Sequence, residues 1–299
     1  MSKYYLILAF LFTAQMSSGQ DGAQNPKFTN YWYSQGAEIS RFKLSQSRYG
    51  EHHTGNAVMI FVTEPMNPSL QVKADQQRPD NVPVLKLNSM RKFNTGIYPY
   101  SVMTSIFSPI DTAVYPSPLK ITFSMQEWCG HIFSQMNLRD NAYILDSKSY
   151  FEQESDTKST LANVVTEDGL LTRIRLSPES LPLGKFTIIP SLLISRLLHV
   201  KVAVMNVSAS IQTLSSESLE GNELLEYTIQ FPFFKRVLKI AFEKNFPHRI
   251  QEIQDTYPPT AYFGNKVMTT RLIRTHTIYS PYWDKHKNID RNLRKKLGL

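Results

Sequence analysis

The chain has 299 residues, of which 41% are hydrophobic and 12% aromatic, and its 33 basic and 25 acidic residues give a formal net charge of +8. This composition is typical of a globular protein and excludes a disordered chain. A single cysteine excludes a disulfide framework within the chain, so packing and β-ladders must stabilise the fold. The mild positive charge favours peripheral contact with an anionic membrane surface. Because no nucleic-acid-binding signature accompanies it, we expect no nucleic-acid partner.

The N-terminus is typical of a secretory signal peptide. An apolar run of 11 residues, 4–14, follows a short basic start, and Ser17 and Gly19 stand three residues and one residue before a cleavage ahead of Gln20. The run is shorter than the roughly 20 residues that a membrane-spanning helix needs. We therefore predict that residues 1–19 are a signal peptide, cleaved near Gly19–Gln20, and that the mature chain is periplasmic or associated with the outer envelope. A retained N-terminal anchor is the alternative.

Most of the remaining chain shows the short apolar–polar alternation that is typical of β-strands. The strand candidates are residues 37–44, 56–64, 83–93, 96–110, 119–128, 131–138, 141–151, 170–176, 185–189, 200–212, 225–233, 236–243, 249–257 and 266–279. Many strands at regular spacing favour an antiparallel sheet over βαβ units. Two candidates, residues 200–212 and 266–279, are longer than an ordinary strand, which suggests a large curved sheet.

These strands predict an all-β fold: a large curved antiparallel sheet, or a half-open barrel or sandwich, with a short C-terminal helix. Residues 20–299 are predicted to form a single β-rich domain. A soft internal boundary falls near residues 152–169, where the chain becomes polar and acidic.

One helix is predicted, over residues 288–298. Asn288 can cap its start, and Ile289, Leu293 and Leu297 recur on one face. Such a helix either docks on the sheet or lies with its basic side against a membrane surface.

The only cysteine lies in the stretch SMQEWCGHIF, residues 124–133. If this stretch is one β-strand, Glu127, Cys129 and His131 point to the same face. They are then candidates for an acid–thiol–base catalytic set, although neighbours on one face of a strand are roughly 7 Å apart, and a dyad needs about 3 Å. The alternative is an ordinary strand in which the cysteine is a small packed side chain.

Motifs for metals and cofactors are missing from the sequence. No C-x-x-C or H-x-x-x-H pattern accompanies the cysteine, and the chain has neither of the glycine-rich phosphate-binding motifs. We predict no metal site and no cofactor.

Aromatic residues gather near both ends of the mature chain. Tyr31 and Trp32 lie near its start, Tyr282 and Trp283 near its end, and Trp128 lies beside the cysteine. These five are candidates for binding a hydrophobic or sugar-containing ligand, because flat rings stack on such molecules. Packing within the fold is the alternative.

Several stretches resemble a family of exported bacterial envelope proteins of about this length. They include VKADQ, QEWCGH, IIPSLLISRLLHV and the ending YWDKHKNIDRNLRKKLGL. Many members of that family carry an N-terminal lipobox, which this chain lacks, and the resemblance implies export but no established activity.

Members of that family often carry the label septum formation inhibitor Maf. Maf-type nucleotide pyrophosphatases are α/β proteins with an S-x-S-P-R-R loop, and the nearest fragments here, PSPLK and LSPES, lack its arginines. The residues therefore do not support that activity.

Three functions remain open from the sequence. The leading hypothesis is a non-enzymatic protein whose curved sheet binds a lipid, glycolipid or other hydrophobic envelope molecule. The second is a hydrolase or transferase that uses Cys129 and a histidine. The third is a structural partner that acts only through its surface.

Overall fold

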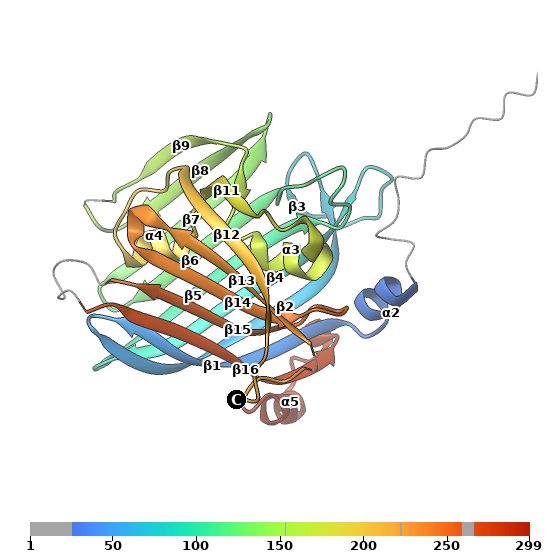
Figure 1. Ribbon diagram of the computed structural model, residues 1–299. Coiled ribbons are helices and arrows are strands. Elements are labelled where there is room, and N and C mark those ends of the chain that lie inside the picture. Colours follow the sequence, from blue (N-terminus) through green and yellow to red (C-terminus); the bar gives the residue numbers. More distant parts are fainter. Residues whose placement is uncertain (1–25, 153, 222, 259–265) are drawn as a thin grey trace, which may run out of the picture.

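The computed structural model describes residues 26–152, 154–221, 223–258 and 266–299. The predicted signal peptide lies outside these residues. The described chain forms one large, strongly curved sheet of 16 strands (Figure 1).

The strands are β1 (Ala37–Arg48), β2 (Glu51–Asn67), β3 (Val72–Lys73), β4 (Val82–Thr95), β5 (Tyr98–Pro109), β6 (Lys120–Glu127), β7 (Gly130–Arg139), β8 (Ala142–Ser149), β9 (Thr157–Ala162), β10 (Val165–Thr166), β11 (Gly184–Ile189), β12 (Met205–Leu214), β13 (Leu224–Phe231), β14 (Arg236–Glu243), β15 (Ile250–Tyr257) and β16 (Met268–Ser280). Their order is β10-β11-β12-β13-β14-β15-β16-β1-β2-β4-β5-β6-β7-β8-β9, with β3 paired to β2. Every pairing is antiparallel except that of β10 with β11. Since β10 and β9 are the two end strands, the sheet is open, and the prediction of a large curved antiparallel sheet is confirmed.

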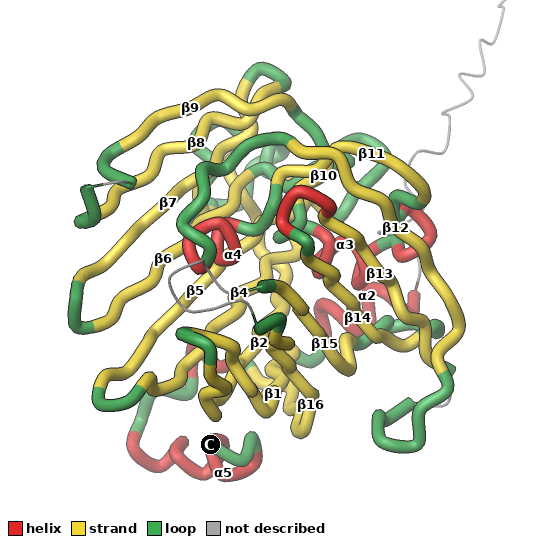
Figure 2. The backbone as a smooth tube through the Cα atoms, turned by 60° about the vertical axis from the view of Figure 1, so that its left-hand side comes forward, coloured by secondary structure: helices red, strands yellow, loops and turns green. Residues whose placement is uncertain are grey.

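The helices are short and lie on both sides of the sheet. They are α2 (Pro26–Ser34), α3 (Leu170–Leu176), α4 (Leu192–Leu197) and α5 (Asn292–Lys296), with 3₁₀ turns η1 (Pro178–Ser180), η2 (Pro232–Phe234), η4 (Tyr282–Asp284) and η5 (Asn288–Arg291). Figure 2 shows α3 and α4 inside the concavity and α5 outside it. The C-terminal helix was predicted, whereas α2 was not.

The prediction of a strand over residues 170–176 is wrong, because this segment is α3. The apolar positions of this seven-residue segment fit both the two-residue period of a strand and the 3.6-residue period of a helix. In the structure Leu170 and Ile174, four residues apart, both belong to the buried core, which is the spacing of a helix face.

The register of the strands places one row of side chains on the concave face and the next on the outer face. Residues that pair across antiparallel strands share a face. One such inner row runs Phe42, Ala57, Arg91, Val102, Met125, Ile132. Five of its six members are apolar, and all five are buried in the main core. Arg91 is the exception, so it projects a charge into an apolar surface.

The outer face carries a smaller core. Leu297, just after α5, packs with Ala37, Ile39 and Val62, so the C-terminal segment is docked on the outside of β1 and β2. The main core lies on the opposite face, where α3 and α4 meet the strands.

Candidate binding site on the concave face

A cavity lies between the concave face and the part of the chain that carries α3 and α4. Its volume is about 60 Å³, room for a few water-sized groups. A second cavity of about 40 Å³ shares five lining residues with it. The apolar wall of the first cavity consists of Leu171, Leu193, Ile194, Leu197, Leu238, Ile240 and Ile253.

Arg236, on β14, is the fully paired cation of this cavity. Its guanidinium donates to Glu167 at 2.6 and 2.8 Å and to Asp255 on β15, at 3.0 Å for the Nη2–Oδ2 bond. Burial lowers the pKa of Arg236, but the two carboxylates raise it more, so its pKa lies above the ordinary value. This pairing ties Glu167, three residues before α3, to β14 and β15.

Arg91 and Asp168 face the same cavity without forming an ion pair with each other. Within the described chain Arg91 has no carboxylate oxygen within 4.0 Å, and Nη1 reaches Gln46 Oε1 at 3.3 Å. Burial lowers its pKa. Burial, followed by the charge of Glu167, raises the pKa of Asp168 to about 6. Asp168 Oδ2 accepts the backbone N–H of Leu192, the first residue of α4, at 3.1 Å. The cavity therefore combines apolar walls with one cation and one carboxyl group that form no ion pair with each other.

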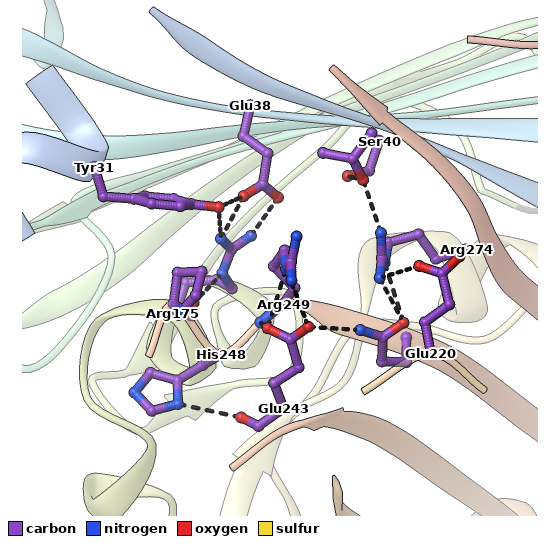
Figure 3. A network of polar contacts seen from close by, with 12 residues as sticks. Tyr31, Glu38, Ser40, Arg175, Glu220, Glu243, His248, Arg249 and Arg274 are labelled. Atoms are coloured by element: carbon purple, nitrogen blue, oxygen red, sulfur yellow. Dashed lines mark hydrogen bonds and ion pairs between the residues drawn. The ribbon is translucent and has the colours of Figure 1, made fainter. Parts of the chain in front are cut away.

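The other end of α3 is fixed by Arg175, which is fully buried. Its Nη1 and Nη2 donate to the two carboxylate oxygens of Glu38 on β1, at 2.7 and 2.6 Å, and Tyr31 from α2 also donates to Glu38 (Figure 3). The guanidinium lies 4.9 Å from the ring centre of Trp32 and 4.6 Å from that of Phe61. Burial alone would raise the pKa of Glu38, but Arg175 and the other groups around Glu38 together lower it by a larger amount. The pKa of Glu38 therefore lies below its ordinary value, and Glu38 stays ionised.

Two further contacts fix α4. Arg48 on β1 donates to the backbone oxygen of Leu197 at 2.7 Å. Arg196 pairs with Glu154 and lies 4.4 Å from the ring centre of Phe151. We call residues 167–177 and 191–199, which carry α3 and α4, the inner segment; β11, between them, belongs to the sheet. Buried polar contacts thus attach the inner segment at three places.

The structure separates the predicted catalytic residues. Residues 124–133 are not one strand, so the condition for a shared face is not met. In agreement with the separate candidates 119–128 and 131–138, β6 ends at Glu127 and β7 begins at Gly130, which leaves Cys129 in the turn. Gly130 has φ of +158°, and a Cβ there would lie 3.0 Å from Tyr150, so glycine fits this turn. Glu127 pairs with Gly130, and His131 pairs with Gln126, so Glu127 and His131 point to opposite faces.

Cys129 also has no activating partner in the described structure. Its thiol is exposed at the tip of the hairpin, and its backbone N–H donates to Glu127 Oε2 at 2.6 Å. A side-chain hydrogen bond of the thiol with Glu127, followed by the charge of Glu127, raises the pKa of Cys129. A nucleophilic cysteine needs the opposite shift.

None of the five aromatic ligand-binding candidates lines either described cavity. Tyr31 bonds Glu38, and Trp32 is buried in the main core. Tyr282 packs on the outer core, whereas Trp128 and Trp283 are 68% and 52% exposed. Their roles are therefore in packing or at the surface.

Sequence reasoning missed the charged residues of the cavity. They are Arg91, Glu167, Asp168, Arg236 and Asp255. The available signal was a charge at an inner position of a strand, as at Arg236, which is two residues from the buried Leu238.

Other kinds of site are not found in the part of the chain that the structure describes. No group of three or more His, Cys, Asp or Glu side chains there could hold a metal ion. No helix among the described residues is long and apolar enough to cross a membrane. No protein-family model, curated protein or solved structure matches the chain, so the resemblance to exported envelope proteins stays a prediction.

The Glu38–Arg175 pair gives a test by double-mutant cycle. Glu38→Gln and Arg175→Met should each lower the free energy of unfolding by about 3–5 kcal/mol, because each leaves a buried charge unpaired. The double variant should lose much less than the sum. Urea unfolding is measured for the wild type, the two single variants and the double variant. The exposed pair Lys148–Asp146 is the control, and its coupling should be close to zero. Additive losses at Glu38 and Arg175 would contradict the pairing.

Asp168 should make stability depend on pH. Its folded-state pKa of about 6 lies above the ordinary 3.8, so the folded state binds the extra proton between these values and loses stability as pH rises through 6. Relative to its effect near pH 4, Asp168→Asn should therefore stabilise the protein at neutral pH, by on the order of 2 kcal/mol. Urea unfolding across this range measures the difference in unfolding free energy between the variant and the wild type. A difference that does not change with pH would show that the pKa of Asp168 is not raised.

Cys129 should react as an ordinary or slow thiol. Glu127→Gln removes the neighbouring charge, so it should lower the pKa of Cys129 and speed alkylation by iodoacetamide below the pKa. The rate is measured against pH on the folded chain, with Glu51→Gln, at another hairpin, as the variant expected to change nothing. A wild-type midpoint well below about 8.5 would instead indicate an activated thiolate and revive the cysteine-enzyme hypothesis.

Proposed function

We propose that the protein is a non-enzymatic binder of a hydrophobic or amphipathic envelope molecule, a lipid or glycolipid, on the concave face of the sheet. The observation that carries the proposal is the cavity between this face and the inner segment, with its apolar wall and with Arg91 and Asp168, which form no ion pair with each other. Ligand pockets typically combine apolar walls with a few polar groups that orient the ligand.

The size of the cavity sets how such a ligand would bind. About 60 Å³ admits a small group but not an acyl chain or a fused ring system. The larger apolar area of the concave face lies beneath α3 and α4, since Leu170, Ile174 and Ile194 pack on it. A full-sized ligand would therefore take the place of the inner segment, while its polar part would meet Arg91 or Asp168.

The attachment of the inner segment is compatible with such an exchange. Its helices have only seven and six residues, and isolated helices of this length are not stable. Buried ion pairs position it, and such pairs contribute specificity more than net stability, because desolvation offsets much of their attraction. A ligand that buries comparable apolar area on the sheet can compete with these contacts.

A cysteine-dependent enzyme is less well supported. Cys129 lies in an exposed turn, away from the cavity, and its pKa is raised rather than lowered. We therefore rank the binding function first.

A disulfide between the inner segment and the sheet tests the proposal. The hydroxyl oxygens of Ser108 on β5 and Thr172 on α3 are 2.7 Å apart, close enough for a disulfide between cysteines at these positions. In a Cys129→Ser background, oxidised S108C/T172C should bind the fluorescent apolar probe N-phenyl-1-naphthylamine at least tenfold more weakly than its reduced form. Natural lipids extracted from the source cell should displace the probe from the reduced protein.

The matched control places a disulfide elsewhere on the same face. Ser134 and Ser147, whose hydroxyl oxygens are 2.8 Å apart, join β7 to β8 and leave the inner segment free, so S134C/S147C should bind equally well in both states. Equal binding by oxidised and reduced S108C/T172C would show that the ligand does not replace the inner segment. Failure of the unmodified protein to bind the probe or any extracted lipid would overturn the function itself.

A further inference from the structure

The C-terminal segment concentrates positive charge on the outer surface. Between η4 and the end of α5 it contains two acidic residues, Asp284 and Asp290, and six basic ones. The basic residues are Lys285, Lys287, Arg291, Arg294, Lys295 and Lys296. All six are exposed, and within the described chain none has a carboxylate oxygen within 4.0 Å. Asp290 is engaged locally, where it accepts the backbone N–H of Lys287 at 2.9 Å.

The same segment exposes large apolar side chains. Trp283 is 52% exposed and Ile289 is 80% exposed. The predicted apolar stripe of Ile289, Leu293 and Leu297 is therefore divided, since only Leu297 is buried on the sheet. A tryptophan and an isoleucine among lysines and arginines are the side chains that enter a lipid headgroup region.

The docking of the segment directs these groups outward. Tyr282 and Leu297, near its two ends, pack on the outer core of β1 and β2, so the residues between them project away from the sheet. Beside the C-terminus lies Arg41, whose guanidinium bonds the neutral Asn56 and thus adds another positive charge. Figure 1 shows α5 on the side of the sheet opposite to α3 and α4.

We propose that residues 282–297 form a docking surface for an anionic lipid bilayer, which we call the basic surface. Unpaired cations attract anionic headgroups, and each basic residue near such a surface strengthens binding roughly fivefold. The exposed Trp283 and Ile289 favour a bilayer over a nucleic acid, because they gain by entering an apolar medium rather than by facing phosphates. In this orientation the concave face points away from the bilayer.

Vesicle sedimentation tests the proposal on a chain that begins at Gln20, because the described fold begins at Pro26 and the apolar run 4–14 would bind bilayers by itself. The chain should bind phosphatidylcholine vesicles only when they contain phosphatidylglycerol, and added salt should release it. The variant R294Q/K295Q/K296Q should bind on the order of 100-fold more weakly. The matched control K158Q/K185Q/K235Q removes the same charge from exposed positions on β9, on β11 and just after η2, and it should keep most of the binding.

Tryptophan quenching by brominated lipid then reports which residue enters the bilayer. Quenching should be largely lost in Trp283→Phe and kept in Trp128→Phe, which removes the other exposed tryptophan. Equal loss of binding in the two triple variants, or equal binding to neutral vesicles, would overturn the proposal. It would also be overturned if duplex DNA bound as strongly as the anionic vesicles and lost its binding in the same triple variant, since the surface would then attract any polyanion.

Discussion

The apolar concave face of an open, strongly curved sheet must be covered, and the rest of this structure depends on how that is done. A closed sheet would cover that face with its own far wall, but here β10 and β9 end the sheet without meeting. The chain instead folds residues 167–177 and 191–199, on either side of β11, into the concavity, where α3 and α4 complete the main core. Burial of this apolar area is the largest favourable contribution to such a fold.

Covering the face with a polypeptide brings charged groups into the interior. Some of these groups form ion pairs, and others do not. Arg175 meets Glu38 of β1, and Arg236 meets Glu167, which precedes α3, and Asp255 of the neighbouring β15, so both buried charges are paired. Arg91 and Asp168 form no ion pair with each other, and they line the cavity together with the paired Glu167, Arg236 and Asp255. The difference separates charges that position the inner segment through ion pairs from charges that form none within the described chain.

The sequence permitted prediction of the strands, because each strand buries one face and alternation records that burial. It did not permit prediction of α3, whose seven residues fit both periods, so only the concave face decides between them. The site was out of reach for a different reason. Glu167 and Arg236 are 69 residues apart, and a pairing over that distance depends on the order of strands. Around Arg91 both faces of β4 are partly polar, so the alternation that marks an inner position is lost there.

The two faces of the sheet therefore present different chemistry, and the same strand, β1, supports both of them. The apolar and partly charged cavity lies on the concave side, while the unpaired cations of residues 282–297 lie on the outer side. Both depend on β1: Glu38 on its inner face holds α3 through Arg175, and Ile39 on its outer face packs with Leu297. Because consecutive residues of one strand support both surfaces, movement of β1 would disturb both. Exchange of the inner segment for a ligand, which leaves β1 in place, would leave the outer surface unchanged.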